Sequence, residues 1–207
     1  MTFLLALVTG FIFYSQQVVA NATALTVGRR LGFGAALAVL GGALAGDALW
    51  AAGALVVVAL SLQVEPLRII FGIVGSFFFL RLAWGALLDA RQGAMPRSDL
   101  SDEPGGWRAG AQITFRNPYA LGFWVGVTAL ICLLTAPQPM GLDYAMLFLG
   151  IVIGAGVWCV LLAWIGSTRR TKLPITFFRT VNLLGGVIAV LIGVVGLYAI
   201  VTPGLVR

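Results

Sequence analysis

The sequence contains no histidine and only two cysteines among its 207 residues. Without histidine, a Ser-His-Asp triad or a histidine-ligated transition-metal site is hard to build. Cys132 and Cys159 lie in separate apolar runs without CxxC spacing, which favours two buried small side chains over a redox or metal pair. Since no nucleophile–base pair or metal-ligand set is recognisable, we expect neither an enzyme nor a cofactor.

Charge is also scarce, because charged residues make up 10% of the chain and hydrophobic residues 60%. A soluble domain carries about a quarter charged residues. Apolar runs of 18 or more residues recur, which is typical of membrane-spanning helices. We therefore predict an all-α integral membrane protein whose surroundings are the lipid bilayer. The net charge of +6 then indicates orientation rather than a nucleic-acid-binding surface.

Six apolar segments each exceed the roughly 20 residues that a helix needs to cross the bilayer. They are Thr2–Leu25, Leu31–Leu62, Pro66–Leu88, Ala109–Leu134, Tyr144–Ile165 and Pro174–Val201. The first, MTFLLALVTG onward, lacks a basic n-region and a clear cleavage site, so we interpret it as a span rather than a signal peptide.

Basic residues concentrate in alternate connections between these segments. Nine of the thirteen lie in the first, third and fifth connections or at the entry to the last segment: Arg29, Arg30, Arg91, Arg97, Arg108, Arg169, Arg170, Lys172 and Arg179. The positive-inside rule places these connections in the cytoplasm and both termini on the opposite side.

A polar, Pro/Gly-rich linker at 91–108 separates two halves, 1–90 and 109–207. Shifting the first half by 100 positions lays Gly10 on Gly110 and Gln17 on Asn117, and a shift of 108 lays Gly42 and Gly46 on Gly150 and Gly154. Each half contains three segments, an odd number, so the second copy is inverted. We therefore predict six transmembrane helices arranged as two inverted three-helix repeats, an architecture of many secondary transporters, with one repeat rocking against the other.

Polar residues interrupt the corresponding first and fourth segments. In inverted-repeat transporters the binding site lies near the midplane, where helices of the two halves are interrupted. The predicted substrate-binding residues are accordingly Gln16, Gln17, Asn21, Arg116, Asn117, Pro118 and Tyr119. An arginine guanidinium suits a substrate carboxylate. Two alternatives stay open: the amides hydrogen-bond across helices, and Arg116 extends to the cytoplasmic headgroups.

Asp47 is the acidic residue nearest the middle of a predicted span. A carboxylate there costs roughly 2.5–3.5 kcal/mol on insertion scales unless it is paired, protonated or hydrated. We predict a proton-coupling role, with a structural ion pair to Arg81 or Arg116 as the alternative.

Two further patterns concern packing. The Gly42–x₃–Gly46 and Gly150–x₃–Gly154 stripes predict close helix contacts. The tryptophans are interpreted mostly as interfacial anchors or lipid contacts.

The chain resembles the LysE/RhtB family of small amino-acid exporters over essentially its whole length. The resemblance rests on the Gly10 opening, the basic turn Arg29–Gly32, the Gly42–Gly46–Asp47 block, and Asn117–Pro118 at the fourth segment. It implies a six-helix exporter of the bacterial inner membrane, driven by the proton motive force. The chain departs from the family pattern in the first segment, where Gln17–Val19 occupy the place of a Pro-Gly-Pro turn, and at Tyr119, where a lysine is common.

The predicted function is therefore proton-coupled export of a small amphipathic solute, such as an amino acid or a derivative. The alternative is a non-transporting membrane scaffold or assembly factor that retains the fold, and a homo-oligomer is left open in either case.

Overall fold

The computed structural model describes residues 1–16, 18–61, 64–93, 106–117, 120–135, 139–168 and 175–202, and every regular element in these ranges is a helix. The helices are α1 (Thr2–Ser15), α2 (Val18–Leu31), α3 (Phe33–Ser61), α4 (Glu65–Gln92), α5 (Trp107–Phe115), α6 (Ala120–Thr135), α7 (Gly141–Ser167) and α8 (Ile175–Val201). Four of these, α3, α4, α7 and α8, are long and apolar enough to cross a membrane alone. The pairs α1–α2 and α5–α6 are bent by 67° and 79°, and they bring the number of spans to six if each pair crosses once.

The bend between α1 and α2 occurs without proline or glycine. A helix end leaves its last carbonyl groups without partners inside the helix. The side chain of Asn21 provides partners for two of these carbonyl groups. Its Nδ2 donates to the carbonyl oxygens of Tyr14 at 3.0 Å and Ser15 at 3.1 Å. The amide of Asn21 thus supports the break at the point where relatives of the resembled family carry Pro-Gly-Pro.

The bend between α5 and α6 lies where the sequence predicts an interruption. Here α5 ends at Phe115, and the N–H groups of Arg116 and Asn117 donate back to Gln112 and Thr114 at 3.0 and 3.1 Å. The predicted helix breaker Pro118 lies outside the described residues. The next helix, α6, begins at Ala120.

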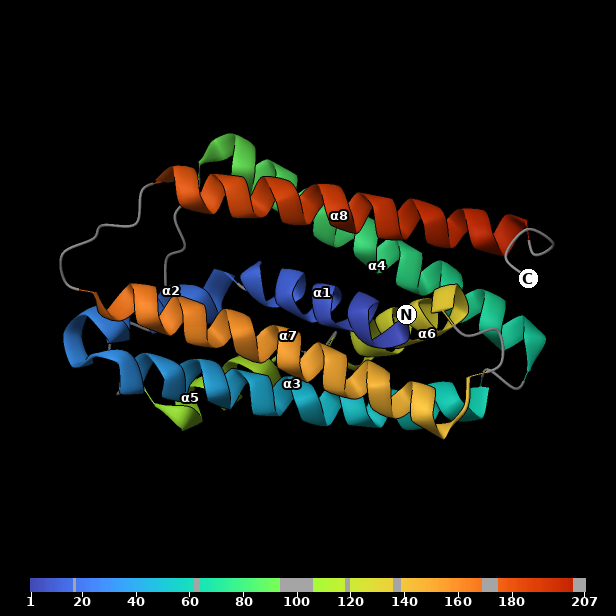
Figure 1. Ribbon diagram of the computed structural model, residues 1–207, viewed down its shortest axis with the longest axis horizontal. Coiled ribbons are helices and arrows are strands. Elements are labelled where there is room, and N and C mark those ends of the chain that lie inside the picture. Colours follow the sequence, from blue (N-terminus) through green and yellow to red (C-terminus); the bar gives the residue numbers. More distant parts are fainter. Residues whose placement is uncertain are drawn as a thin grey trace.

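Helices from different halves of the chain pack along one another. In Figure 1, α1 runs beside α7, α5 beside α3, and α4 beside α8. Each pair joins one half to the other, so the two halves are not separate packing units. Rocking of one three-helix half against the other, as the repeat predicts, would pull these packed faces apart.

Glycine permits two of these crossings, as the small-residue stripes predict. A Cβ on Gly154 of α7 would collide with the backbone of Leu7 and Phe11 in α1. A Cβ on Gly42 of α3 would collide with the equivalent backbone in α5, at Trp107 and Ala111. Gly154 in the α1–α7 crossing therefore corresponds to Gly42 in the α3–α5 crossing. The sequence alignment matched Gly42 to Gly150 instead, which lies one helical turn before Gly154.

The α4–α8 pair lies to one side of the other helices (Figure 1). Its tightest link to them is the crossing of α4 and α6, where the backbones of Gly75 and Gly126 meet. No comparable packing joins α8 to α2 within the described residues.

The basic connections lie at one end of the bundle. The end of α2, the end of α4, and the starts of α5 and α8 all lie toward the left in Figure 1, and they carry Arg29, Arg30, Arg91, Arg108 and Arg179. Both α1 and α8 have their free ends toward the right. The edges of the predicted linker are helical, since α4 continues to Gln92 and α5 starts at Trp107; residues 94–105 lie outside the described ranges.

Candidate functional site

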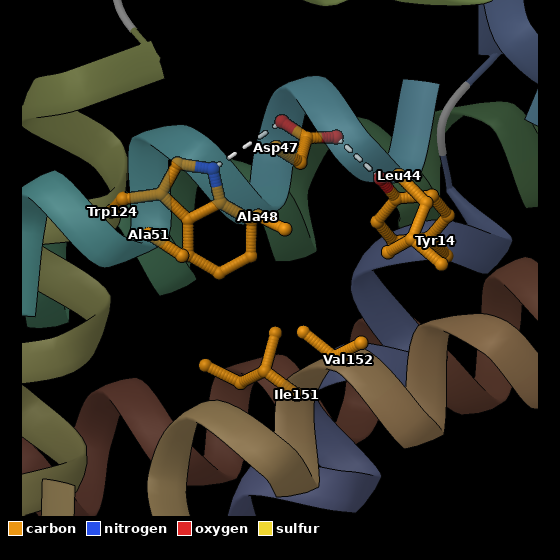
Figure 2. A pocket seen from close by; sticks show the side chains of 8 residues that line it. All are labelled: Tyr14, Leu44, Asp47, Ala48, Ala51, Trp124, Ile151 and Val152. Atoms are coloured by element: carbon orange, nitrogen blue, oxygen red, sulfur yellow. Dashed lines mark hydrogen bonds between the residues drawn. The ribbon is translucent and has the colours of Figure 1, made fainter. Parts of the chain in front are cut away.

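Asp47 of α3 is only 5% exposed, and its carboxylate lies in the interior of the bundle. The Tyr14 hydroxyl donates a hydrogen bond to its Oδ2 at 2.7 Å, and the Trp124 indole Nε1 donates to its Oδ1 at 3.3 Å (Figure 2). Tyr14 comes from α1 and Trp124 from α6. Asp47 is therefore connected to both of the bent helix pairs.

A narrow pocket adjoins this carboxylate. Its remaining lining is apolar: Leu44, Ala48, Ala51, Ile151 and Val152. The space between these side chains is nowhere wide enough for a water molecule. Figure 2 shows Ile151 and Val152 of α7 across the pocket from Asp47. The carboxylate is thus held by protein donors in an apolar setting.

Among the described residues, no ion pair joins Asp47 to Arg81 or Arg116, the predicted alternative. Arg81 and Arg116 are both exposed. The salt bridge found within the described ranges joins Arg68 to Glu65 at 3.9 Å. The Tyr14 and Trp124 donors on Asp47 are neutral groups rather than cations.

The amide of Asn21 belongs to a second buried cluster. Besides donating to the end of α1, Asn21 accepts a hydrogen bond from Trp158 Nε1 on α7 at 3.2 Å. The Trp158 ring stacks on Phe177 of α8, with ring centres 6.5 Å apart. Asn21 therefore forms the cross-helix hydrogen bonds of the structural alternative; a role in substrate binding stays a prediction.

Gln16 differs from Asn21 in having its amide unsatisfied. Its Nε2 and Oε1 atoms are both buried, and neither has a hydrogen-bond partner among the described residues. The amide lies directly against the backbone of Gly185 in α8, where an added Cβ would collide with it. The two amides that the sequence groups together thus face different neighbours.

The remaining predicted residues lie apart from Asp47 or cannot be placed. Arg116 and Asn117 are exposed at the end of α5. Gln17, Pro118 and Tyr119 fall outside the described residues. Those of the predicted substrate-binding residues that the structure describes therefore do not form one cluster around Asp47.

Three aromatic residues of the site were not predicted. Trp124 and Trp158 are 1% and 3% exposed, so the interpretation of the tryptophans as interfacial or lipid-facing is wrong for these two. Trp84, Trp107 and Trp164 are exposed, as that interpretation requires, and for them it stays a prediction. One signal was available in the sequence: Trp124 and Trp158 lie well inside their predicted spans, away from the interfaces where indoles usually anchor. Tyr14 carried no comparable signal.

The amino-acid sequence is similar to known proteins over most of its length. The model of the LysE type translocator family matches residues 18–202. The chain is also 29% identical, over 201 residues, to the chemotactic transduction protein ChpE of Pseudomonas aeruginosa, covering 94% of this chain and 96% of that protein. No solved structure matches the chain. Since the family model spans nearly the whole chain, this multi-pass membrane protein belongs to the LysE type translocator family.

Proposed function

We propose that the protein exports a small amphipathic solute, an amino acid or a derivative, across the bacterial inner membrane at the expense of the proton gradient. The observation that carries the proposal is the pair of hydrogen bonds on Asp47, which connect one buried carboxylate to both bent helix pairs. A buried acid in a membrane span marks a functional site by default. In this proposal a change in its protonation acts directly on α1 and α6, whose side chains donate to it.

Tyr14 is the partner whose hydrogen bond can adapt when Asp47 takes up a proton. An indole N–H can only donate a hydrogen bond, whereas a phenol hydroxyl can donate or accept. When Oδ2 takes up a proton, the Tyr14 hydroxyl changes from donor to acceptor, while Trp124 continues to donate to Oδ1. Protonation thus alters the link between α3 and α1 and preserves the link between α3 and α6.

Similar crossings between helices of the two halves support the inverted repeat that this proposal assumes. The α1–α7 and α3–α5 crossings use equivalent backbone contacts, as inversion requires. Within the described residues the α4–α6 crossing has no counterpart between α8 and α2, and such a difference between equivalent contacts is what one of two access states would show. The basic end of the bundle faces the cytoplasm in this proposal, and both termini face the opposite side.

Efflux from proteoliposomes tests the proposal. Purified protein is reconstituted, the vesicles are loaded with radiolabelled amino acids, and a pH gradient is imposed. We expect gradient-dependent efflux that Asp47→Asn abolishes, because the amide cannot exchange a proton. Asp89→Asn, at the basic end of α4, is the matched control and should transport normally. Unchanged pH-dependent efflux by Asp47→Asn would rule out the proton-coupling role.

A second function is favoured by the name of one relative. ChpE is described as a chemotactic transduction protein, which agrees with the alternative of a non-transporting membrane component of a larger assembly. Affinity purification from native membranes distinguishes the two functions. Stable co-purification of signalling proteins, together with no efflux from reconstituted protein, would favour the assembly role over export.

A further inference from the structure

The carboxamide of Gln16 is placed to bind a ligand rather than to hold the fold together. Its Nε2 and Oε1 atoms are buried at the end of α1 and lack partners among the described residues. A buried polar group without a hydrogen-bond partner destabilises the folded protein. Asn21, five residues further on, has hydrogen bonds on both its nitrogen and its oxygen. The same type of side chain is thus satisfied at one position and unsatisfied at the other.

The wall facing this carboxamide belongs to a separate packing unit. Gly185 of α8 lies against Gln16, and α8 packs mainly along α4 rather than along α1. The glycine leaves the carboxamide room that any other residue would fill. The Gln16 amide therefore lies on the plane between the α4–α8 pair and α1, on a side of α1 different from the one that Tyr14 presents to Asp47.

We infer that Gln16 is the solute-recognition residue of the proposed exporter, and that its site opens when the α4–α8 pair separates from α1. The carboxamide offers a donor and an acceptor side by side. It therefore matches a solute group that accepts and donates at neighbouring atoms, such as the carboxylate and amino groups of a free amino acid. The inference rests on the proposed function and adds to it the residue that binds the solute and the surface through which the solute enters.

An aromatic contact at the basic end of α8 opposes separation of the α4–α8 pair from α1. There the Phe177 ring stacks on Trp158, which in turn donates to Asn21. Phe178 is buried in the same cluster as Tyr14 and Trp158. Opening the Gln16 site toward that end therefore requires this aromatic contact to part.

Two substitutions test the inference in the purified full-length protein in lipid nanodiscs. The probes are the free L-amino acids, added one at a time, and the readouts are the melting temperature and the dissociation constant. We expect at least one amino acid to raise the wild-type melting temperature by mass action. Gln16→Leu should weaken its binding about tenfold or more, as loss of two hydrogen bonds implies. Its melting temperature without solute should equal or exceed that of the wild type, because an unsatisfied amide has been removed.

The second substitution closes the space without touching the carboxamide. In Gly185→Ala the new methyl group meets the Gln16 side chain, so binding should weaken similarly. Gly186→Ala is the matched control, since its methyl group meets Leu87 of α4 instead, and it should bind as the wild type does.

The possible outcomes distinguish a failure of the role inferred for Gln16 from a failure of the proposed export function. A wild-type dissociation constant in Gln16→Leu, or a lower melting temperature without solute, would overturn the inference and leave the exporter proposal standing. A wild-type protein that responds to no amino acid would overturn both the proposed solute class and the inference.

Discussion

The Tyr14 hydroxyl lies 2.7 Å from Oδ2 of Asp47, and this hydrogen bond joins the end of α1 to the middle of α3 inside the bundle. Tyr14 is fully buried and Asp47 nearly so. Because α1 stops one residue after Tyr14, the bond fixes the broken end of a helix to an acidic group. This contact thus joins the fold of α1 to the carboxylate that we propose to carry the proton.

Replacing Tyr14 with phenylalanine should lower the free energy of unfolding by about 1.5–3 kcal/mol, the usual contribution of a hydrogen bond to a charged group. Thermal or denaturant unfolding in detergent micelles measures this. Tyr144→Phe is the control, because the Tyr144 hydroxyl is buried without a partner among the described residues. Equal losses in the two variants would show that the Tyr14 bond contributes nothing specific.

Trp124→Phe removes the indole N–H that donates to Asp47 Oδ1 and leaves an aromatic ring in place. Trp50→Phe removes an indole whose Nε1 is buried without a partner among the described residues. Both changes remove similar ring volume, so the difference between them isolates the hydrogen bond. We expect Trp124→Phe to be less stable than Trp50→Phe by about 1–3 kcal/mol in the same unfolding assay. No difference would contradict the role given to Trp124.

Asn21→Leu should destabilise the protein by at least about 2 kcal/mol, because it leaves the Tyr14 and Ser15 carbonyls and the Trp158 indole without their partner. A double-mutant cycle with Trp158→Phe should show non-additive losses, as expected for residues in direct contact. Asn182→Leu, on the partly exposed face of α8, is the comparison. If Asn21→Leu costs no more than this comparison, another group must support the break between α1 and α2.

Gly154→Ala should separate α1 from α7, because the new methyl group would collide with the Leu7 backbone, which cannot move aside as a side chain can. We expect the free energy of unfolding to fall by about 3 kcal/mol or more, the upper end of the usual range for overpacking. Gly53→Ala in α3 meets open space and should stabilise by about 0.5–1 kcal/mol through helix propensity. A Gly154→Ala variant that melts with the wild type would contradict the close crossing.

The spans and the two breaks followed from local features of the sequence. Apolar length predicted the helices, and polar residues within apolar runs marked both interruptions. Asp47 stood out because an acid inside a membrane span is costly. Each of these signals resides in a short stretch of chain, which is why sequence reasoning could use it.

The contacts around Asp47 and the amides depend on how distant helices meet. Nothing near Tyr14, Trp124 or Trp158 indicates that they donate to Asp47 or Asn21, because the partners lie 33, 77 and 137 residues away. The alignment of the halves slipped by one turn for a related reason. Gly150 and Gly154 lie one helical turn apart, so the sequence alone matches Gly42 to either of them equally well.

The pairing of α1 with α7 also sets an order for biogenesis. When α1 leaves the ribosome, the helix whose glycines receive it has not yet been synthesised, since α7 begins at Gly141. The first span must therefore wait in the membrane, with its break unsupported by Trp158, until most of the chain has been inserted. A nascent chain that stops before α7 therefore leaves the face of α1 around Leu7 and Phe11 without the helix that packs on it.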